Sequence, residues 1–225
     1  MLKKFVEVLK NLVPPPEVFD PSQFNDPLAT QVEWTPMHPK GTSFRTHKLV
    51  QLHSDRVEFQ PAWGLKLFLG IFLFAGAFAP ISFVFALAIS GQMNSRMIFT
   101  ILIPIVMGTV IVIVGYMLYY RHSAPIVCDR YSGYFWKGRK APNEVLNINA
   151  IKDACKLEDI HALQLISEYC QDSKSSYYSY ELNLVLNTGN RINVVDHGNQ
   201  EKLRQDAQVL SVFLQVPVWD AIESE

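Results

Sequence analysis

Six histidines and three cysteines are the side chains in this sequence of 225 residues that could bind a metal. No two histidines stand four residues apart, as on a zinc-binding helix, and the sequence has no Cys-x-x-C pair. Asp196-His197 does place an acid beside a histidine at a predicted strand end, a position that hydrolases use for triad members. The sequence lacks a Gly-x-Ser-x-Gly elbow, and neither Ser167 nor Cys170 lies in a nucleophile motif. A helix cap formed by Asp196 or Asn199 is the alternative interpretation. We therefore expect a non-enzymatic protein with no metal and no cofactor.

A basic and aromatic cluster, Trp136-Lys-Gly-Arg-Lys140, follows the second of two apolar runs and could contact anionic lipid. Each Lys or Arg close to such a surface contributes about 1 kcal/mol. Aromatic and basic residues at the ends of the runs are expected at the same depth. Residues 121–225 nevertheless carry eleven basic and fourteen acidic residues, which favours simple positive-inside anchoring over a basic lipid-binding module. The residues assigned to lipid contact are Trp63, Lys66, Tyr119, Tyr120, Arg121, Trp136, Lys137, Arg139 and Lys140.

Two aromatic segments could bind another protein. Residues 173–180 are rich in tyrosine, which offers a large contact area at low entropic cost. Residues 14–39 are rich in proline but too aromatic for a disordered linker. The first segment could equally be a mobile loop between strands, and the second could pack on this chain's own domain. The residues assigned to partner binding are Tyr177, Tyr178, Tyr180, Phe24 and Trp34.

Two uncharged apolar runs, 67–90 and 97–120, predict that these groups lie at a membrane. A spanning helix needs about 20 apolar residues, and each run exceeds this length. The turn Gly91–Arg96 is so short that the two helices should form a tight antiparallel hairpin. Small residues allow such helices to pack closely. The residues expected near the hairpin seam are Gly70, Gly76, Gly108 and Gly115.

The distribution of Lys and Arg predicts the orientation of the hairpin. Basic residues flank both runs, whereas the turn has only Arg96. Because positive residues favour the cytoplasmic side, both termini are predicted in the cytoplasm. The three cysteines would then lie in a reducing compartment as free thiols. Few polar residues occur in the runs, which disfavours a channel formed by one copy. A homo-oligomer is plausible, because a lone hairpin leaves most of its lipid-facing surface available for packing.

These patterns divide the chain into three regions. Residues 1–60 contain an amphipathic helix that ends at Pro14-Pro15-Pro16, the proline-rich segment, and a bent strand or strand pair at Thr46–Phe59. Residues 61–122 form the transmembrane hairpin. Residues 123–225 form a cytoplasmic domain of short antiparallel strands.

The third region has the clearest alternation. Between Tyr180 and Asn187, leucines alternate with polar residues, which predicts a strand whose polar face, with Glu181 and Asn183, lies outward. An amphipathic helix is expected at about Asn199–Leu214. The strands are predicted at Pro125–Asp129, Gly133–Trp136, Ala162–Glu168, Tyr180–Asn187 and Arg191–Val195.

Three stretches carry a resemblance to known proteins: Cys128-Asp-Arg-Tyr-Ser-Gly-Tyr-Phe-Trp-Lys, Leu157-Glu-Asp-Ile-His-Ala-Leu-Gln-Leu and Leu210-Ser-Val-Phe-Leu-Gln-Val-Pro. With the apolar hairpin before them, they make the chain resemble bacterial membrane proteins that join a transmembrane hairpin to a pleckstrin-homology-like domain. The order of elements is also similar to that of photosystem I assembly factors. The resemblance covers roughly Pro61 to Trp219. It implies a curved antiparallel sheet closed by a C-terminal helix, and fold alone does not give function.

The expected fold class is therefore α+β: a two-helix transmembrane hairpin with a small PH-like domain, in the bacterial inner membrane. The expected function is to hold a protein partner at the membrane, as an assembly factor, an accessory subunit or an immunity-type protein. One alternative is a lipid-charge sensor that uses Lys137, Arg139 and Lys140. Another is a membrane-bound hydrolase that uses Asp196 and His197. The excess of acidic residues argues against nucleic-acid binding.

Overall fold

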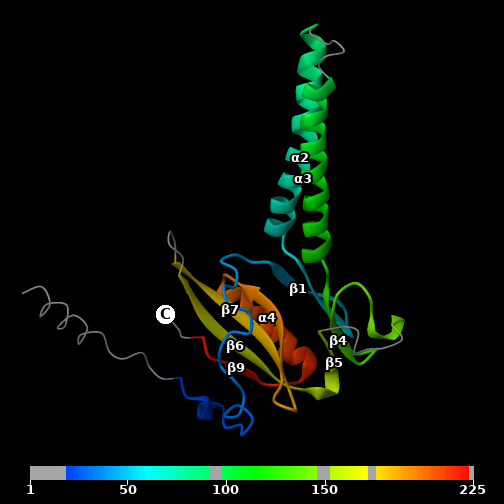
Figure 1. Ribbon diagram of the computed structural model, residues 1–225. Helices are drawn as coiled ribbons and strands as arrows, with labels where there is room; N and C mark the ends of the chain where they lie inside the picture. Colours follow the sequence, from blue (N-terminus) through cyan, green and yellow to red (C-terminus); the bar gives the residue numbers. More distant parts are fainter. Residues whose placement is uncertain (1–18, 92–97, 146–152, 172–175, 223–225) are drawn as a thin grey trace, which may run out of the picture. The chain divides into compact units, whose positions relative to one another are not determined.

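The structure is a computed structural model and describes residues 19–91, 98–145, 153–171 and 176–222. Three α-helices and nine β-strands lie in these ranges (Figure 1). The predicted N-terminal amphipathic helix and most of the turn between the apolar runs fall outside the described residues. The elements are β1 (His47–His53), β2 (Arg56–Pro61), α2 (Trp63–Ile89), α3 (Ile98–His122), β3 (Ile126–Asp129), β4 (Tyr134–Lys137), β5 (Ala154–Lys156), β6 (Ile160–Gln171), β7 (Ser176–Leu186), β8 (Arg191–His197), α4 (Gln200–Leu214) and β9 (Val218–Asp220).

The chain divides into two units, residues 1–34 and 35–225, and all the elements above belong to the second. One sheet has the order β1-β2-β3-β4-β5 and is antiparallel throughout. β2 and β3 are neighbours in this sheet, although α2 and α3 lie between them in the sequence. The helical hairpin is thus inserted into the connection between two adjacent strands. The predicted regions 1–60 and 123–225 therefore share one sheet.

The second sheet has the order β8-β7-β6-β9, with β9 parallel to β6 and the other pairs antiparallel. Residues 187–190 connect β7 to β8, and Gly189 there has a φ of 81°, a conformation that glycine adopts at little steric cost. β6 extends beyond both ends of the predicted strand Ala162–Glu168, and β7 begins four residues before the predicted strand Tyr180–Asn187 and ends one residue earlier. Their extra residues pair across the strands, with Tyr169 opposite Tyr178.

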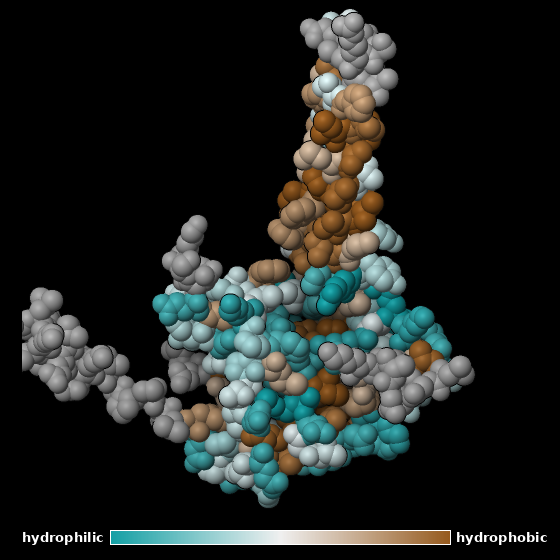
Figure 2. Space-filling model, viewed as in Figure 1, coloured by the Kyte–Doolittle hydropathy of each residue, from teal (hydrophilic) through white to brown (hydrophobic). Residues whose placement is uncertain are grey.

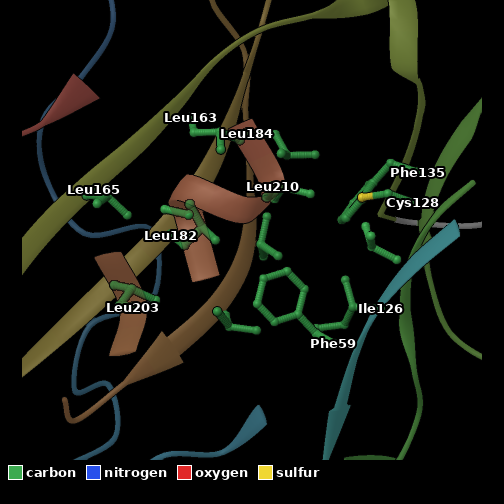
Figure 3. Packing of buried hydrophobic residues seen from close by; sticks show 14 of the residues in the cluster. Phe59, Ile126, Cys128, Phe135, Leu163, Leu165, Leu182, Leu184, Leu203 and Leu210 are labelled. Atoms are coloured by element: carbon green, nitrogen blue, oxygen red, sulfur yellow. The ribbon is translucent and has the colours of Figure 1, made fainter. Parts of the chain in front are cut away.

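The hydrophobic core lies between the two sheets and α4 (Figure 3). Leucines of β6 and β7 meet leucines of α4 on one side, and residues of β2, β3 and β4 face them from the other. Burial of each such leucine contributes about 2 kcal/mol. The largest fully buried apolar side chains of this cluster are Phe59, Phe135, Leu163, Leu165, Leu182, Leu184, Leu203 and Leu210.

The helices α2 and α3 have 27 and 25 residues. At about 1.5 Å per residue they are roughly 40 Å and 37 Å long, more than the roughly 30 Å of a bilayer core. Both are long and apolar enough to cross a membrane. In α2 only Leu65, Leu69 and Gly76 are buried. Figure 2 shows the brown, hydrophobic surface of this hairpin giving way to polar side chains where it meets the sheets.

Candidate functional site

Three of the four glycines expected at the hairpin seam lie there. A Cβ atom added to Gly76 or Gly115 would meet a side chain of the opposite helix at 2.9 Å or 3.3 Å, respectively. A Cβ added to Gly108 would overlap with the Gly76 carbonyl oxygen and the ring of Pro80. Gly70 is different, because nothing lies within 4 Å of its Cβ position. Six residues before Gly76, it is rotated by about 240° around the helix and faces away from the seam.

The ends of α2 and α3 that join the sheets carry the aromatic and basic residues expected at a membrane interface. The helices continue past the uncharged runs to include Trp63, Lys66 and Arg121. All of the expected residues have exposed side chains. Their exposure leaves them accessible to lipid headgroups. They are Trp63, Lys66, Tyr119, Tyr120 and Arg121.

The cluster 136–140 does not form one surface. Trp136 is only 2% exposed, so its assignment to lipid contact is wrong. The guanidinium carbon of Arg56 lies 5.5 Å from the centroid of its ring. Lys140 is exposed, as expected for a residue beyond the strand end.

Lys137 and Arg139 are held where the hairpin meets the sheets. Lys137 Nζ donates a hydrogen bond to Asn193 Oδ1 on β8 at 3.1 Å. Arg139 points back to the end of α3, where its Nη2 donates to Ser123 Oγ at 2.7 Å and its Cζ lies 4.4 Å from the ring centroid of Tyr120. Arg139 therefore connects the domain to the hairpin, whereas Lys137 connects β4 to β8 within the domain.

A cavity of about 560 Å³ lies at this junction, and we call it the junction cavity. One part of its wall is apolar and comes mainly from the ends of α2 and α3, and the other part is polar and comes from β1, β4, β8 and the end of α3. No local sequence pattern predicts this cavity, because its walls come from six helices and strands far apart in the chain. Its apolar wall includes Leu65, Phe68, Leu69 and Leu118, and its polar wall includes His47, Arg121, His122, Lys137, Asn193 and Asp196.

Burial dominates the electrostatics of the junction cavity. It lowers the pKa of Lys137 and raises that of Asp196. Burial, followed by the charge of Lys137, lowers the pKa of His47 to about 4, so that this ring is neutral at pH 7. Asn193 lies between the two charged groups, because its Nδ2 donates to Asp196 Oδ1 at 2.9 Å while its Oδ1 accepts from Lys137.

Asp196 and His197 do not form the acid–histidine pair that a triad requires. They are adjacent on β8, and neighbouring side chains on a strand point to opposite faces. Asp196 lines the junction cavity, whereas His197 is fully buried and its Nδ1 accepts a hydrogen bond from the backbone N–H of Asn199 at 3.0 Å. Of the two predicted caps of α4, Asn199 is the one observed: its Oδ1 accepts from the N–H of Lys202 at 2.9 Å.

His197 makes the stability of the domain dependent on pH. Burial, followed by the charge of Arg45, lowers its pKa from 6.5 to about 4. Since the unfolded chain then binds the proton more tightly, the stabilisation is complete above pH 6.5 and is lost as the pH falls toward 4. Between about pH 7.5 and about pH 5, we expect wild type to lose about 2 kcal/mol more unfolding free energy than His197→Gln. Denaturant titrations in detergent measure this difference, and parallel losses in the two proteins would contradict it.

The tyrosines expected to bind a partner have different environments. Tyr177 donates its hydroxyl to the carbonyl oxygen of Gly41 at 2.9 Å, and Tyr180 is 8% exposed in the core. Tyr180 therefore cannot offer area to a partner, and its assignment is wrong. Tyr178 is 51% exposed, and its ring centroid lies 5.2 Å from that of Tyr169, which is 55% exposed. We call Tyr169 and Tyr178 the tyrosine pair. Tyr169 was missed because its proximity depends on the register of β6 and β7.

The polar face of β7 lies under an extended segment of the same unit, residues 35–45, drawn in blue (Figure 1). The outward polar side chains of this strand, Glu181 and Asn183, are buried. The carboxylate of Glu181 accepts hydrogen bonds from the backbone N–H groups of Met37 at 2.9 Å and His38 at 2.8 Å. This part of the proline-rich segment therefore packs on the chain's own domain.

Phe24 and Trp34 belong to the first unit, where they contact each other. Their rings are stacked with centroids 5.4 Å apart, and Phe19 lies 4.6 Å from Trp34. The indole Nε1 of Trp34 donates to the carbonyl oxygen of Ala29 at 2.9 Å. Part of the aromatic area that we assign to a partner is therefore used within residues 19–34.

Comparison of the chain with protein-family models, curated proteins and solved structures found no significant match in any of the three.

Proposed function

We propose that this chain is a non-enzymatic protein of the bacterial inner membrane that holds a protein partner at the membrane surface. The observation that carries the proposal is the apolar surface of α2 and α3. Large side chains along the hairpin, such as Phe74, Ile81 and Phe85, are about two-thirds exposed. A continuous apolar surface of this length is unstable in water and is satisfied by lipid.

The topology supports a domain held at that surface. Because the hairpin connects two adjacent strands, β2 and β3, both ends of the hairpin join the same sheet. The two sheets and the C-terminal helix also agree with a PH-like domain in the order of their elements. Two short connections hold the domain close to the bilayer. A surface that binds a partner at the membrane must lie at such a short distance from it.

The tyrosine pair is the partner surface in this proposal. Tyr169 and Tyr178 are large, half-exposed aromatic side chains on paired strands, and tyrosine is enriched among residues that dominate binding energy. Tyr177 and Tyr180 support the pair from within the domain and do not contact the partner.

Affinity purification of the tagged full-length protein from its native host, in mild detergent, tests the proposal. We expect a stoichiometric partner with wild type and a loss of roughly 30-fold or more with the double variant Tyr169→Ser/Tyr178→Ser. Tyr131→Ser is the matched control, because Tyr131 is 91% exposed outside the pair. Equal recovery with the double variant, or recovery of this protein alone, would contradict the proposal.

A further inference from the structure

We propose that the junction cavity binds the headgroup and the first acyl carbons of an anionic membrane phospholipid, with Lys137 as the residue that contacts the phosphate. This inference goes beyond partner binding, and it depends only on the membrane insertion in the proposed function. Its chemistry follows from the cavity wall, the hydrogen bonds of Lys137 and the place of the cavity along the hairpin.

The wall of the cavity has two chemical characters. Leu65, Phe68, Leu69 and Leu118 form an apolar part that could contact an acyl chain, and the part from the sheets is polar. A volume of about 560 Å³ is within the range of small-molecule sites, roughly 300–1,000 Å³. The apolar part is the larger, and a ligand with only one of these characters would leave the other part of the wall unmatched.

The charges favour an anion. Among the side chains of the wall, Lys137 and Arg121 contribute two positive charges and Asp196 contributes one negative charge. Asp153 and Glu181 lie outside the wall, but their charges also act on Lys137. An ammonium has three donor hydrogens, and the acceptor of Lys137 in the domain is the neutral amide oxygen of Asn193. The amide of Asn193 already donates to Asp196, so this carboxylate is partly satisfied. A phosphate oxygen would give this ammonium a charged hydrogen-bond acceptor in addition to the Asn193 amide oxygen.

The position of the cavity selects a lipid over a soluble phosphate. Its apolar wall includes residues from the first two turns of α2 and the last turns of α3. The same turns carry Trp63, Lys66 and Tyr120, which are residue types that favour the depth of lipid headgroups. If the hairpin spans the membrane, phospholipids are therefore adjacent to the cavity.

The test uses full-length, delipidated protein in a neutral detergent and four probes: dioctanoyl phosphatidylglycerol, dioctanoyl phosphatidylcholine, dioctanoylglycerol and glycerol phosphate. The first probe has the chain and a net negative charge, the second has a zwitterionic headgroup, the third lacks the phosphate and the fourth lacks the chains. Isothermal titration calorimetry measures each dissociation constant. Wild type should bind phosphatidylglycerol at least about tenfold tighter than each of the others.

Variants locate the site. Lys137→Met should weaken phosphatidylglycerol binding about tenfold or more, whereas Lys137→Arg and the exposed control Lys202→Met on α4 should stay within about twofold of wild type. Without lipid, Lys137→Met should melt no lower than wild type, because it removes a buried charge with a neutral acceptor. Leu118→Trp, which fills the cavity from the hairpin side, should also abolish binding, with Leu102→Trp as its control. This variant tests the cavity even if Lys137→Met fails to fold.

Equal binding by wild type and Lys137→Met, with binding retained in Leu118→Trp, would overturn the assignment. Equal affinity for dioctanoylglycerol would show that no anion is recognised, and equal affinity for phosphatidylcholine that a net charge is not required. Tight binding of glycerol phosphate would replace the lipid with a soluble phosphate ester. None of these results requires a protein partner, so a failure here is distinct from a failure of the partner proposal.

Discussion

Gly108→Ala should separate the two helices of the hairpin. The added Cβ would overlap with the Gly76 carbonyl oxygen and the ring of Pro80. A backbone atom and a proline ring cannot rotate away, so the helices must move apart. We expect a loss of about 3 kcal/mol of packing free energy. Heating the protein in maltoside micelles and measuring the monodisperse fraction by gel filtration tests this.

Gly70→Ala is the matched control for that experiment. It makes the same chemical change on the same hairpin, but nothing lies within 4 Å of the new Cβ atom. Since alanine is the better helix former, this variant should equal wild type or gain up to about 1 kcal/mol. Equal thermal stability of the two variants would mean that the seam is not packed as described.

Glu181→Ala should release the segment 35–45 from the second sheet. Glu181 is 2% exposed and accepts hydrogen bonds from the N–H groups of Met37 and His38. The substitution leaves both donors without this acceptor, and we expect the free energy of unfolding to fall by roughly 2–4 kcal/mol. Limited proteolysis should then cut within residues 35–45, and denaturant titration should give the loss of stability.

Glu168→Ala is the control for this experiment, because it removes a second carboxylate that binds the segment 35–45. Glu168 accepts from the N–H groups of Lys40 at 3.0 Å and Gly41 at 3.3 Å, but it is only half-buried. Because water can replace the Glu168 carboxylate at this half-buried position, we expect the free energy of unfolding to fall by no more than about 1 kcal/mol. A loss as large as that of Glu181→Ala would show that burial does not decide the effect.

Local patterns in the sequence predict the elements of this fold well. The two apolar runs, five of the seven strands described after Arg121 and the helix α4 have strong periodicity or strong apolar bias, which are local properties. The short strands β5 and β9 were not predicted. Three cysteines were expected as free thiols, and Cys128, Cys155 and Cys170 are free. The insertion of the hairpin between β2 and β3 is a pairing over more than sixty residues, and no local pattern encodes it.

Side-chain environments at the candidate site were harder to predict for the same reason. Trp136 is of a residue type common at membrane interfaces, but it is buried in the folded domain, where Arg56 of β2 lies over its ring. The alternation of residues along β7 predicts that Glu181 is solvated, but the segment 35–45 covers it. The junction cavity depends on contacts among six elements. In each example the deciding contact comes from a distant part of the chain.

Membrane insertion of the hairpin is the claim on which both the partner proposal and the lipid assignment depend. It is tested most directly by protease protection of the full-length, C-terminally tagged protein, in spheroplasts and in inverted inner-membrane vesicles, after a carbonate wash. We predict that the protein stays in the membrane pellet, that its domain is digested in inverted vesicles, and that it is protected in intact spheroplasts. Release by carbonate, or digestion of the domain from outside the spheroplasts, would contradict this account.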